Sequence, residues 1–227
     1  MKQSKISWPQ AKYIATDLVR RRASSDPDSF TQTLQDARVD LNPHQVESAL
    51  FAFRSPLSGG AILADEVGLG KTIEAGIILS QKWAERKRRL VIIAPANLRK
   101  QWVEELEEKF YLPAFILDKK VMNLCLANKE GVNPFETDRI VVCSYDFARR
   151  QERYLRLAQL DLVVLDEAHR LRNVYRPDNQ TGNILRNALI GKKKILLTAT
   201  PLQNSLLELY GLTSFIDEYA FGDLKSF

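Results

Sequence analysis

Two glycines, a lysine and a threonine follow a short apolar run in the first third of the chain. Residues 61–64 predict a strand, after which the chain passes Gly68 and Gly70 into Lys71, Thr72 and a helical apolar pattern. Backbone N–H groups can approach phosphate oxygens at such glycines because no Cβ is in the way, and the start of a helix attracts anions. The stretch predicts a phosphate-binding loop in which Lys71 reaches the β/γ-phosphates and the Thr72 hydroxyl binds Mg²⁺.

The match to the general pattern G-x-x-x-x-G-K-[ST] is incomplete, because Asp65 stands where that pattern has its first glycine. The alternative is a tight strand-to-helix turn with a solvated lysine. The order of strand, Gly-x-Gly-Lys-Thr and helix favours a phosphate loop, with the Lys71 side chain in solvent until phosphate arrives. The nucleotide-binding residues predicted in this loop are Asp65, Glu66, Val67, Gly68, Leu69, Gly70, Lys71 and Thr72.

A second candidate motif is an apolar run that ends in two carboxylates, Leu162–Leu165 followed by Asp166 and Glu167. Ligands gather at the carboxyl ends of strands in open α/β sheets, so both acids should lie beside the phosphate loop. Asp166 is predicted to hold Mg²⁺, partly through water, and Glu167 is the candidate base for the attacking water. A pair of acids at a helix N-terminus is the alternative. It does not explain why they follow an apolar strand in a chain with a phosphate loop.

Several short apolar runs are continuous and do not alternate with polar residues, which is typical of strands buried on both faces. Helical segments separate them, so the sequence predicts an α/β fold with a doubly wound, mostly parallel sheet. Residues 1–40 predict a helical extension packed on this domain. The predicted strands are 61–64, 90–94, 140–143, 162–165 and 195–197, and the predicted helices of the domain include 44–53, 98–110 and 181–190.

The composition is that of an ordinary globular protein, with 45% apolar and 27% charged residues among 227. No apolar run approaches the roughly 18 residues of a membrane span, and no signal core follows Met1, so we expect a cytoplasmic protein without a membrane partner. The formal charge of +5 favours a polyanionic partner. Cys125 and Cys143 are predicted to be buried thiols. His44 and His169 are too far apart to suggest a metal site by themselves.

Three motifs in order resemble motifs I, II and III of superfamily 2 helicases, and most of all those of the Snf-type double-stranded-DNA translocases. They are Asp65–Thr72, the DEAH box Asp166–His169, and Leu197–Asn204. The family's motif I itself begins with Asp-Glu, so Asp65 agrees with the family. Further matches are His44-Gln45 with the adenine-reading motif, Ile92–Leu98 and Gln101-Trp102 with motif Ia, and Val142–Tyr145 with the motif that follows it. Together they cover residues 41–216.

The resemblance implies a RecA-like lobe that binds ATP and Mg²⁺. Gln45 would read the adenine edge, since an amide offers a donor and an acceptor together. His169, Thr198 and Thr200 would couple the nucleotide site to the DNA groove. Trp102 is predicted to be a core residue, and the basic run 86–89 a solvated surface. The residues implied in duplex DNA binding are Asn97, Arg99, Lys100, Ser144 and Tyr145.

Superfamily 2 motors have two such lobes and carry an arginine finger in the second. Nothing after Asn204 resembles a second lobe, so we expect the first lobe of a longer protein, with 217–227 beginning a linker. The favoured function is that of the ATP-binding lobe of a DNA-dependent ATPase that moves along duplex DNA, and the lobe alone should be nearly inactive. The alternatives are the motor of a restriction or phage-defence complex and a nucleotide-gated protein-binding module.

Overall fold

The computed structural model of the chain describes residues 42–65, 70–128, 132–176, 178–202 and 205–222. The helical extension predicted for residues 1–40 therefore lies outside the described residues. So do Glu66, Val67, Gly68 and Leu69 of the phosphate loop, the end of motif III at 203–204, and residues 223–227 of the predicted linker.

Six parallel strands form one sheet in the order β1-β6-β5-β2-β4-β3, as the predicted doubly wound fold requires. The runs at 90–94 and 162–165 are strands over the predicted residues. One strand, β3, was not predicted, because three residues at a sheet edge give too short an apolar pattern. The strands are β1 Gly60–Leu63, β2 Leu90–Ala94, β3 Ala114–Ile116, β4 Ile140–Ser144, β5 Leu162–Leu165 and β6 Lys194–Leu197.

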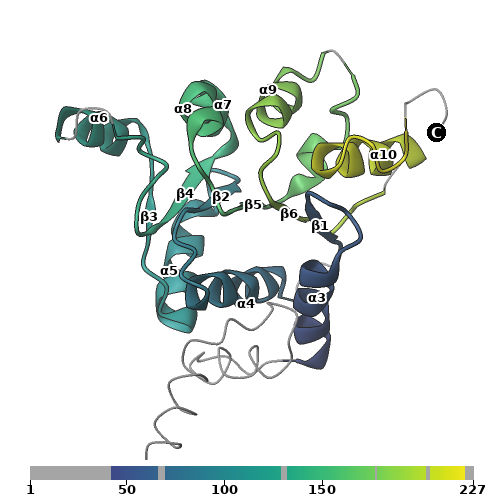
Figure 1. Cartoon of the computed structure of the whole chain (residues 1–227), viewed down its shortest axis with the longest axis horizontal. Coiled ribbons are helices and arrows are strands. Elements are labelled where there is room, and N and C mark those ends of the chain that lie inside the picture. Colours follow the sequence, from purple (N-terminus) through teal and green to yellow (C-terminus); the bar gives the residue numbers. More distant parts are fainter. Residues whose placement is uncertain (1–41, 66–69, 129–131, 177, 203–204, 223–227) are drawn as a thin grey trace, which may run out of the picture.

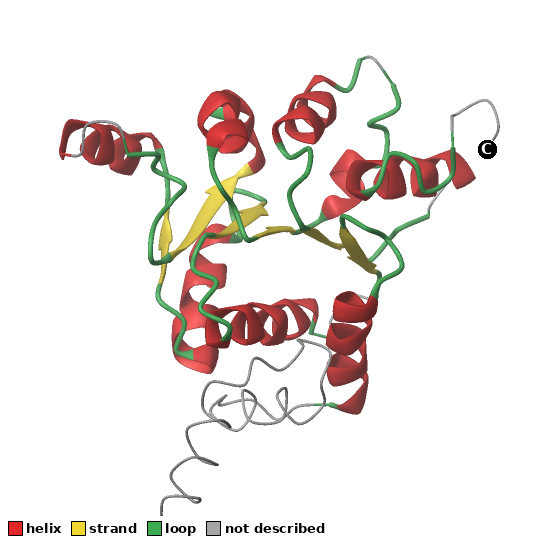
Figure 2. Ribbon diagram, viewed as in Figure 1, coloured by secondary structure: helices red, strands yellow, loops and turns green. Residues whose placement is uncertain are grey.

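Helices cover both faces of the sheet, as Figures 1 and 2 show. One face carries α3 (Pro43–Arg54), α4 (Lys71–Ala84) and α5 (Arg99–Phe110). The described helices on the other side are α6 Lys119–Asn128, α7 Tyr145–Arg150, α8 Glu152–Leu157, the 3-10 helix η1 Ala168–Leu171, α9 Gln180–Ala188 and α10 Leu206–Ile216. None of the described helices combines the length and apolar character needed to cross a membrane.

The central strands are apolar throughout because each of their faces packs against a separate core. In β2, Leu90 and Ile92 join the core beneath α4 and α5, whereas Val91 and Ile93 join the core beneath α7 and α9. All four side chains are fully buried. Burial on both faces removes the polar alternation of a half-exposed strand, and this is the pattern that made these strands recognisable in the sequence.

Cys143 is fully buried in β4, as predicted, but Cys125 is only half-buried, so that prediction is wrong. Cys125 lies on α6, which stands beyond the edge strand β3 in Figure 1. A helix at the end of a sheet covers the core with one side only, so a small apolar residue on it is not forced into the interior.

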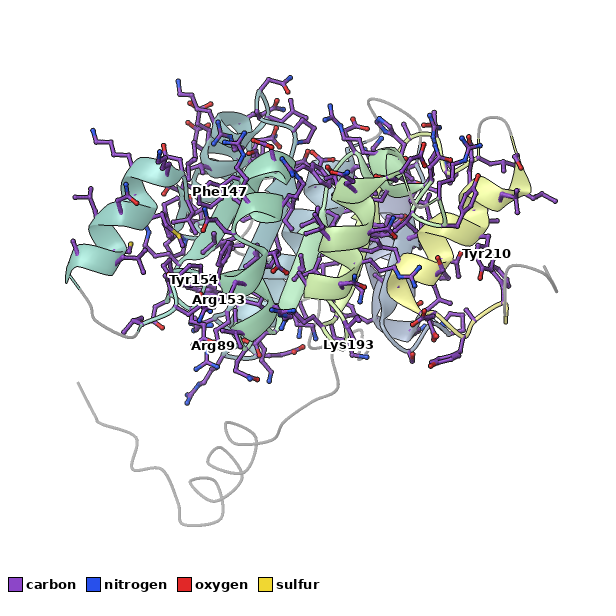
Figure 3. The ribbon with its side chains drawn as sticks, turned by 90° about the horizontal axis from the view of Figure 1, so that it is seen from above. Arg89, Phe147, Arg153, Tyr154, Lys193 and Tyr210 are labelled. Carbon is purple, nitrogen blue, oxygen red and sulfur yellow. The ribbon has the colours of Figure 1, made fainter. Side chains whose placement is uncertain are left out.

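The basic run 86–89 lies at the amino-terminal edge of the sheet, where β2 begins. Arg89 is exposed and its backbone N–H donates to Asp161 at 3.1 Å, while Lys87 Nζ is 3.4 Å from the same carboxylate. In Figure 3, Arg89 and Lys193 lie on one side of the molecule and Phe147, which follows β4, lies towards the other. The prediction of a solvated surface away from the phosphate loop is confirmed.

Candidate nucleotide-binding site

The phosphate loop joins β1 to α4, and its last glycine cannot be replaced without strain. Gly70, the residue before α4, has φ +92°, a conformation that side chains rarely adopt. A Cβ at this position would also lie 2.4 Å from Nε2 of Gln45. The backbone therefore needs glycine where the helix begins and where its free N–H groups are available to an anion.

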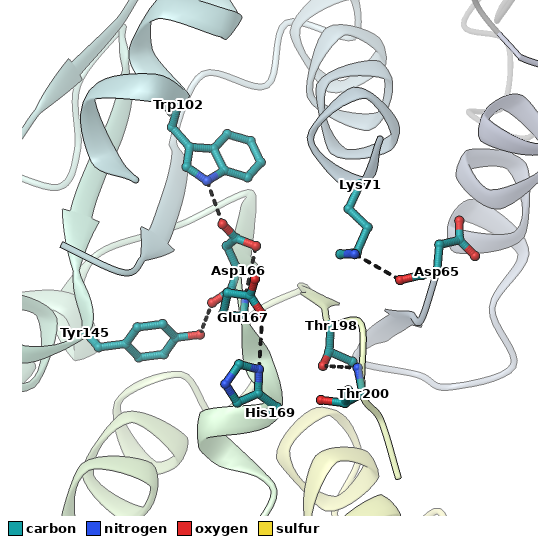
Figure 4. A network of polar contacts seen from close by, with 9 residues as sticks. All are labelled: Asp65, Lys71, Trp102, Tyr145, Asp166, Glu167, His169, Thr198 and Thr200. Carbon is teal, nitrogen blue, oxygen red and sulfur yellow. Dashed lines mark hydrogen bonds and ion pairs between the residues drawn. The ribbon is translucent and has the colours of Figure 1, made fainter. Parts of the chain in front are cut away.

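Lys71 does not extend freely into solvent, contrary to the expectation from sequence. Its Nζ donates to the main-chain carbonyl of Asp65 at 2.9 Å, and the side chain is half-buried (Figure 4). The Asp65 carboxylate in turn accepts from the Ser48 hydroxyl of α3 at 3.3 Å. The bond from Nζ ties the lysine to the end of β1, so its loss removes a structural hydrogen bond as well as the predicted phosphate contact.

Gln45, the predicted adenine-reading residue, lies on α3 directly beside the loop. It is 5% exposed, and its Oε1 accepts from the Asn42 backbone N–H at 3.2 Å. A side-chain amide offers a donor and an acceptor together, which is the combination that an adenine edge requires. The proximity of Gln45 to Gly70 suits the predicted role, which stays a prediction.

Asp166 and Glu167 follow β5, and three groups hold Asp166 in place. Its Oδ2 accepts from the Trp102 indole Nε1 at 2.9 Å and its Oδ1 from the Glu167 backbone N–H at 2.8 Å. The Tyr145 hydroxyl donates to the Asp166 main-chain carbonyl at 2.7 Å. Figure 4 shows Asp166 at the centre of these contacts, with Lys71 approaching the same region from α4.

Burial and hydrogen-bond donors shift the pKa of Asp166 in opposite directions. Asp166 is only 7% exposed, and this burial raises the pKa of its carboxyl. The Trp102 indole and the Glu167 backbone N–H oppose the rise, and Lys71 does so to a smaller extent. A divalent cation would stabilise the ionised carboxylate further, which is the state that a Mg²⁺ site uses.

Glu167, the candidate base, has a left-handed backbone with φ 51° and ψ 47°. For a residue with a Cβ this conformation costs about 1–2 kcal/mol, and such strain is concentrated at functional sites. Its Oε2 lies 3.1 Å from His169 Nδ1, and a third of each side chain is exposed. The histidine thus orients a carboxylate that remains accessible to water.

Thr198 and Thr200 follow β6, between the phosphate loop and Asp166 in the sheet. Thr198 is fully buried, its backbone N–H donates to Leu63 at 3.0 Å, and its hydroxyl accepts from the Thr200 N–H at 3.2 Å. Thr200 is exposed. Motif III therefore connects the end of β1 to the surface, and the predicted coupling role of both threonines stays a prediction.

A buried acid that the sequence did not single out lies in the first turn of α4. Glu74 is fully buried, and neither of its carboxyl oxygens has a hydrogen-bond partner among the described residues. Burial, and then the nearby Asp65 carboxyl, raise its pKa from 4.5 to about 8, while Lys71 acts in the opposite direction. Glu74 is therefore neutral at pH 7. The only sign of this burial in the sequence was the helical spacing of the surrounding apolar residues, which places position 74 on the buried side of the helix.

Substituting Glu74→Gln should remove a pH-dependent loss of stability. Between pH 4.5 and about 8 the folded protein holds a proton that the unfolded chain has released. The free energy of unfolding must then fall as the pH rises through this window. The amide cannot ionise, so the variant should match the original chain near pH 5 and exceed it by on the order of 3 kcal/mol near pH 8.

Urea unfolding at pH 5, 6.5 and 8 without nucleotide or Mg²⁺ measures this difference. Glu108→Gln, at an exposed position of α5, serves as the matched control and should leave the pH dependence unchanged. Parallel pH profiles for Glu74→Gln and the original chain would show that Glu74 does not carry the raised pKa.

The residues implied in DNA binding divide into two groups. Asn97 and Lys100 are exposed where β2 leads into α5, and Arg99 Nε donates to the Ala96 carbonyl at 3.1 Å. Ser144 lies in the neighbouring strand, in register with Ala94, and its hydroxyl caps α7. These four positions share the carboxyl edge of β2 and β4 and stay predicted contacts.

Tyr145 does not belong with them, because its side chain is 6% exposed and its hydroxyl is bonded to Asp166. The side chain therefore faces Asp166 in this structure, and a DNA contact at this position stays a prediction. Trp102 is buried at 2% exposure, as predicted for a core residue, but its contact with Asp166 was missed. A buried indole N–H usually finds an acceptor, and this was the one hint that the sequence offered.

The residues present fit a Mg²⁺·nucleotide. A positive-φ glycine precedes α4, Lys71 and the half-buried Thr72 lie in its first turn, and a buried carboxylate follows β5. The described residues contain no group of three or more His, Cys, Asp or Glu side chains that could enclose a metal. Mg²⁺ takes one or two carboxylates and obtains its remaining ligands from phosphate and water.

Fold and site together define a RecA-like P-loop ATPase lobe of the superfamily 2 type. The chain belongs to the SNF2-related domain family, whose model matches residues 32–227. It is 40% identical over 190 residues to the uncharacterized ATP-dependent helicase YqhH of Bacillus subtilis, covering 82% of this chain and 31% of the helicase. The chain thus spans about a third of that relative.

Two solved structures of the Sulfolobus solfataricus SWI2/SNF2 ATPase core share the fold. The core in complex with dsDNA superposes with a TM-score of 0.69 at 24% identity, over 85% of this chain and 39% of the core. The core domain alone gives 0.66 at 22% identity, over 85% and 38%.

Proposed function

We propose that this chain is the ATP-binding lobe of a longer Snf-type ATPase, which couples ATP hydrolysis to movement along duplex DNA. The observation that carries the proposal is the convergence of three strand ends. Lys71 after β1, Thr198 after β6 and Asp166 after β5 lie around one region at the carboxyl edge of the sheet (Figure 4). Ligands of open α/β sheets bind at this edge.

Each residue has a separate task in this proposal. Lys71 and the N–H groups at the start of α4 bind the phosphates, while Thr72 and Asp166 hold Mg²⁺. Glu167 accepts a proton from the attacking water, and His169 keeps its carboxylate oriented. Mg²⁺, when bound, neutralises charge on the phosphate oxygens. Gln45 selects adenine from the side of α3.

Duplex DNA is the proposed polyanionic partner. The net charge of +5 and the exposed positions Asn97 and Lys100 support it, together with Arg99 and Ser144 at the same edge. A second RecA-like lobe of the same longer chain would complete the DNA groove and supply the arginine finger. Contacts made mainly to phosphates predict binding that weakens steeply with salt. DNA-stimulated ATPase activity of the longer protein is the test, and a nucleotide-gated protein-binding module would not show it.

Lys71→Ala should weaken ATP binding by about 10- to 150-fold, because a charge-assisted hydrogen bond contributes about 1.5–3 kcal/mol. It should also lower the free energy of unfolding by about 1 kcal/mol, because the bond from Nζ to the Asp65 carbonyl is lost. Titration with a fluorescent ATP analogue measures the first effect and urea unfolding the second.

The matched control is Lys109→Ala, which removes a lysine that pairs with Glu105 on α5. It should leave the affinity for ATP unchanged. Equal affinities for the folded Lys71→Ala variant and the original chain would contradict the assignment of the phosphate loop.

A further inference from the structure

The side chain of Trp102 reaches from α5 to the acid at the end of β5, 64 positions further along the chain. Both residues are buried, Trp102 at 2% and Asp166 at 7% exposure. An indole nitrogen is a donor only, and the Asp166 carboxylate is its acceptor in the interior. The contact therefore fixes the orientation of one particular oxygen, Oδ2.

A second side chain holds the main chain of the same acid. The Tyr145 hydroxyl, on the first residue of α7, donates to the Asp166 carbonyl, and this bond is also buried. The Asp166 backbone N–H donates to Ile93 of β2 at 2.9 Å. The carboxylate and the backbone of Asp166 are thus set by separate helices, one on each side of the sheet (Figures 1 and 4).

Both helices start at the segments to which we assign DNA contacts. The turn that contains Asn97 leads into α5, and Trp102 is the fourth residue of that helix. Ser144 caps α7 and directly precedes Tyr145. A displacement of either segment would therefore be transmitted through one buried hydrogen bond to the acid that binds the cation.

We propose that Trp102 and Tyr145 are positioning residues, which orient Asp166 for Mg²⁺ and make its orientation depend on the DNA-facing ends of α5 and α7. The proposal rests on the proposed function and adds the route by which DNA acts on the nucleotide site. Oδ1 and Oδ2 each accept one bond from the protein, so the plane of the carboxylate is fixed while lone pairs remain for a Mg²⁺-bound water.

Trp102→Phe tests the first part, because it removes the indole N–H and keeps an aromatic ring in the core. The affinity of residues 1–227 for ATP is measured in excess Mg²⁺ and again in EDTA. Loss of a group that orients a metal ligand typically weakens metal binding by about 10- to 100-fold. We therefore expect the variant to lose most of the gain in affinity that Mg²⁺ gives, and to keep the affinity measured in EDTA.

The matched control is Trp83→Phe, in the last turns of α4, where the ring stacks on Arg88 at 4.1 Å. It should leave both affinities unchanged. Tyr145→Phe removes only a hydroxyl and remains informative if Trp102→Phe does not fold. It should reduce the Mg²⁺-dependent gain in the same direction. Near-ultraviolet circular dichroism shows whether each variant keeps its packed core.

Fluorescence provides a second test, because a purely structural role of Trp102 would not make its emission depend on Mg²⁺. The chain has three tryptophans, so Trp8→Phe and Trp83→Phe together leave Trp102 as the single fluorescent indole. Binding of Mg²⁺·ATP beside its hydrogen-bond partner should change the Trp102 emission, whereas ATP in EDTA should change it less. Identical emission under both conditions would show that Trp102 does not sense the cation at Asp166.

Duplex DNA tests the second part. Thermodynamic linkage requires that DNA and Mg²⁺·ATP change each other's affinity by the same factor. In the original chain we expect DNA to change the affinity for Mg²⁺·ATP, so that this factor differs from one. In Trp102→Phe the factor should approach one, while the variant still binds DNA. A factor of one in the original chain would overturn the DNA dependence.

The outcomes separate this inference from the proposed function. Failure of the original chain to bind Mg²⁺·ATP at all would overturn both. Normal binding by the original chain, with an unchanged Mg²⁺-dependent gain in Trp102→Phe and Tyr145→Phe, would overturn the positioning role alone.

Discussion

Residues 1–227 alone should hydrolyse ATP about 10³- to 10⁵-fold more slowly than the longer protein, because an arginine finger contributes that much to kcat. The family resemblance places this arginine in the second lobe. Weak binding of Mg²⁺·ATP should survive, since Lys71, Thr72 and Asp166 belong to this lobe. Duplex DNA should not raise the turnover of residues 1–227 appreciably, because half of the proposed groove is supplied by the other lobe.

Phosphate release with and without duplex DNA, at two salt concentrations, measures this difference for both chains. The Lys71→Ala variant of residues 1–227 sets the background rate. DNA-stimulated turnover far above that background would refute the one-lobe proposal, and the catalytic arginine would then have to be sought within these 227 residues.

Glu167→Gln should lower the ATP turnover of the longer protein by about 10²- to 10⁴-fold, because the amide cannot accept a proton from water. ATP binding should be retained, because the Glu167 side chain points to His169 and a third of it is exposed. The fold should also be retained. The bond that Glu167 gives to Asp166 comes from its backbone N–H, which the substitution leaves in place.

Single-turnover hydrolysis and equilibrium ATP binding of the same preparation separate the two effects. Glu152→Gln, which changes the first residue of α8, is a matched control that should leave both unchanged. Normal hydrolysis by Glu167→Gln would mean that another group takes the proton. Loss of ATP affinity instead of rate would assign Glu167 to nucleotide binding.

The local sequence by itself determined those features that depend only on neighbouring residues in the chain. A strand buried on both faces must be apolar throughout, so residues 90–94 and 162–165 were recognisable without any knowledge of their neighbours. The turn at Gly70 needs a positive φ, and the lysine and threonine that follow must begin the helix. Spacing along the chain therefore predicted the phosphate loop and the two acids that follow residues 162–165.

Tertiary structure decided which groups surround those acids. Trp102 and Asp166 are distant in sequence, and only the adjacency of β2 and β5 brings the indole of the following helix to the carboxylate. Tyr145 follows β4, which pairs with β2 on the side opposite β5, and this arrangement brings its hydroxyl to Asp166, while its neighbour Ser144 is half-buried at the end of β4. No spacing rule along the chain contains this information, because it depends on the order of strands in the sheet.

The neutral state of Glu74 likewise could not be predicted from its residue type. An acid in the first turn of a helix is ordinarily solvated and stabilised by the helix dipole. Here α3 packs beside α4 and Asp65 approaches from the end of β1, so the carboxyl loses its water and gains a like charge. Both effects favour the protonated form, and both arise only when segments that are separate in the sequence are packed together.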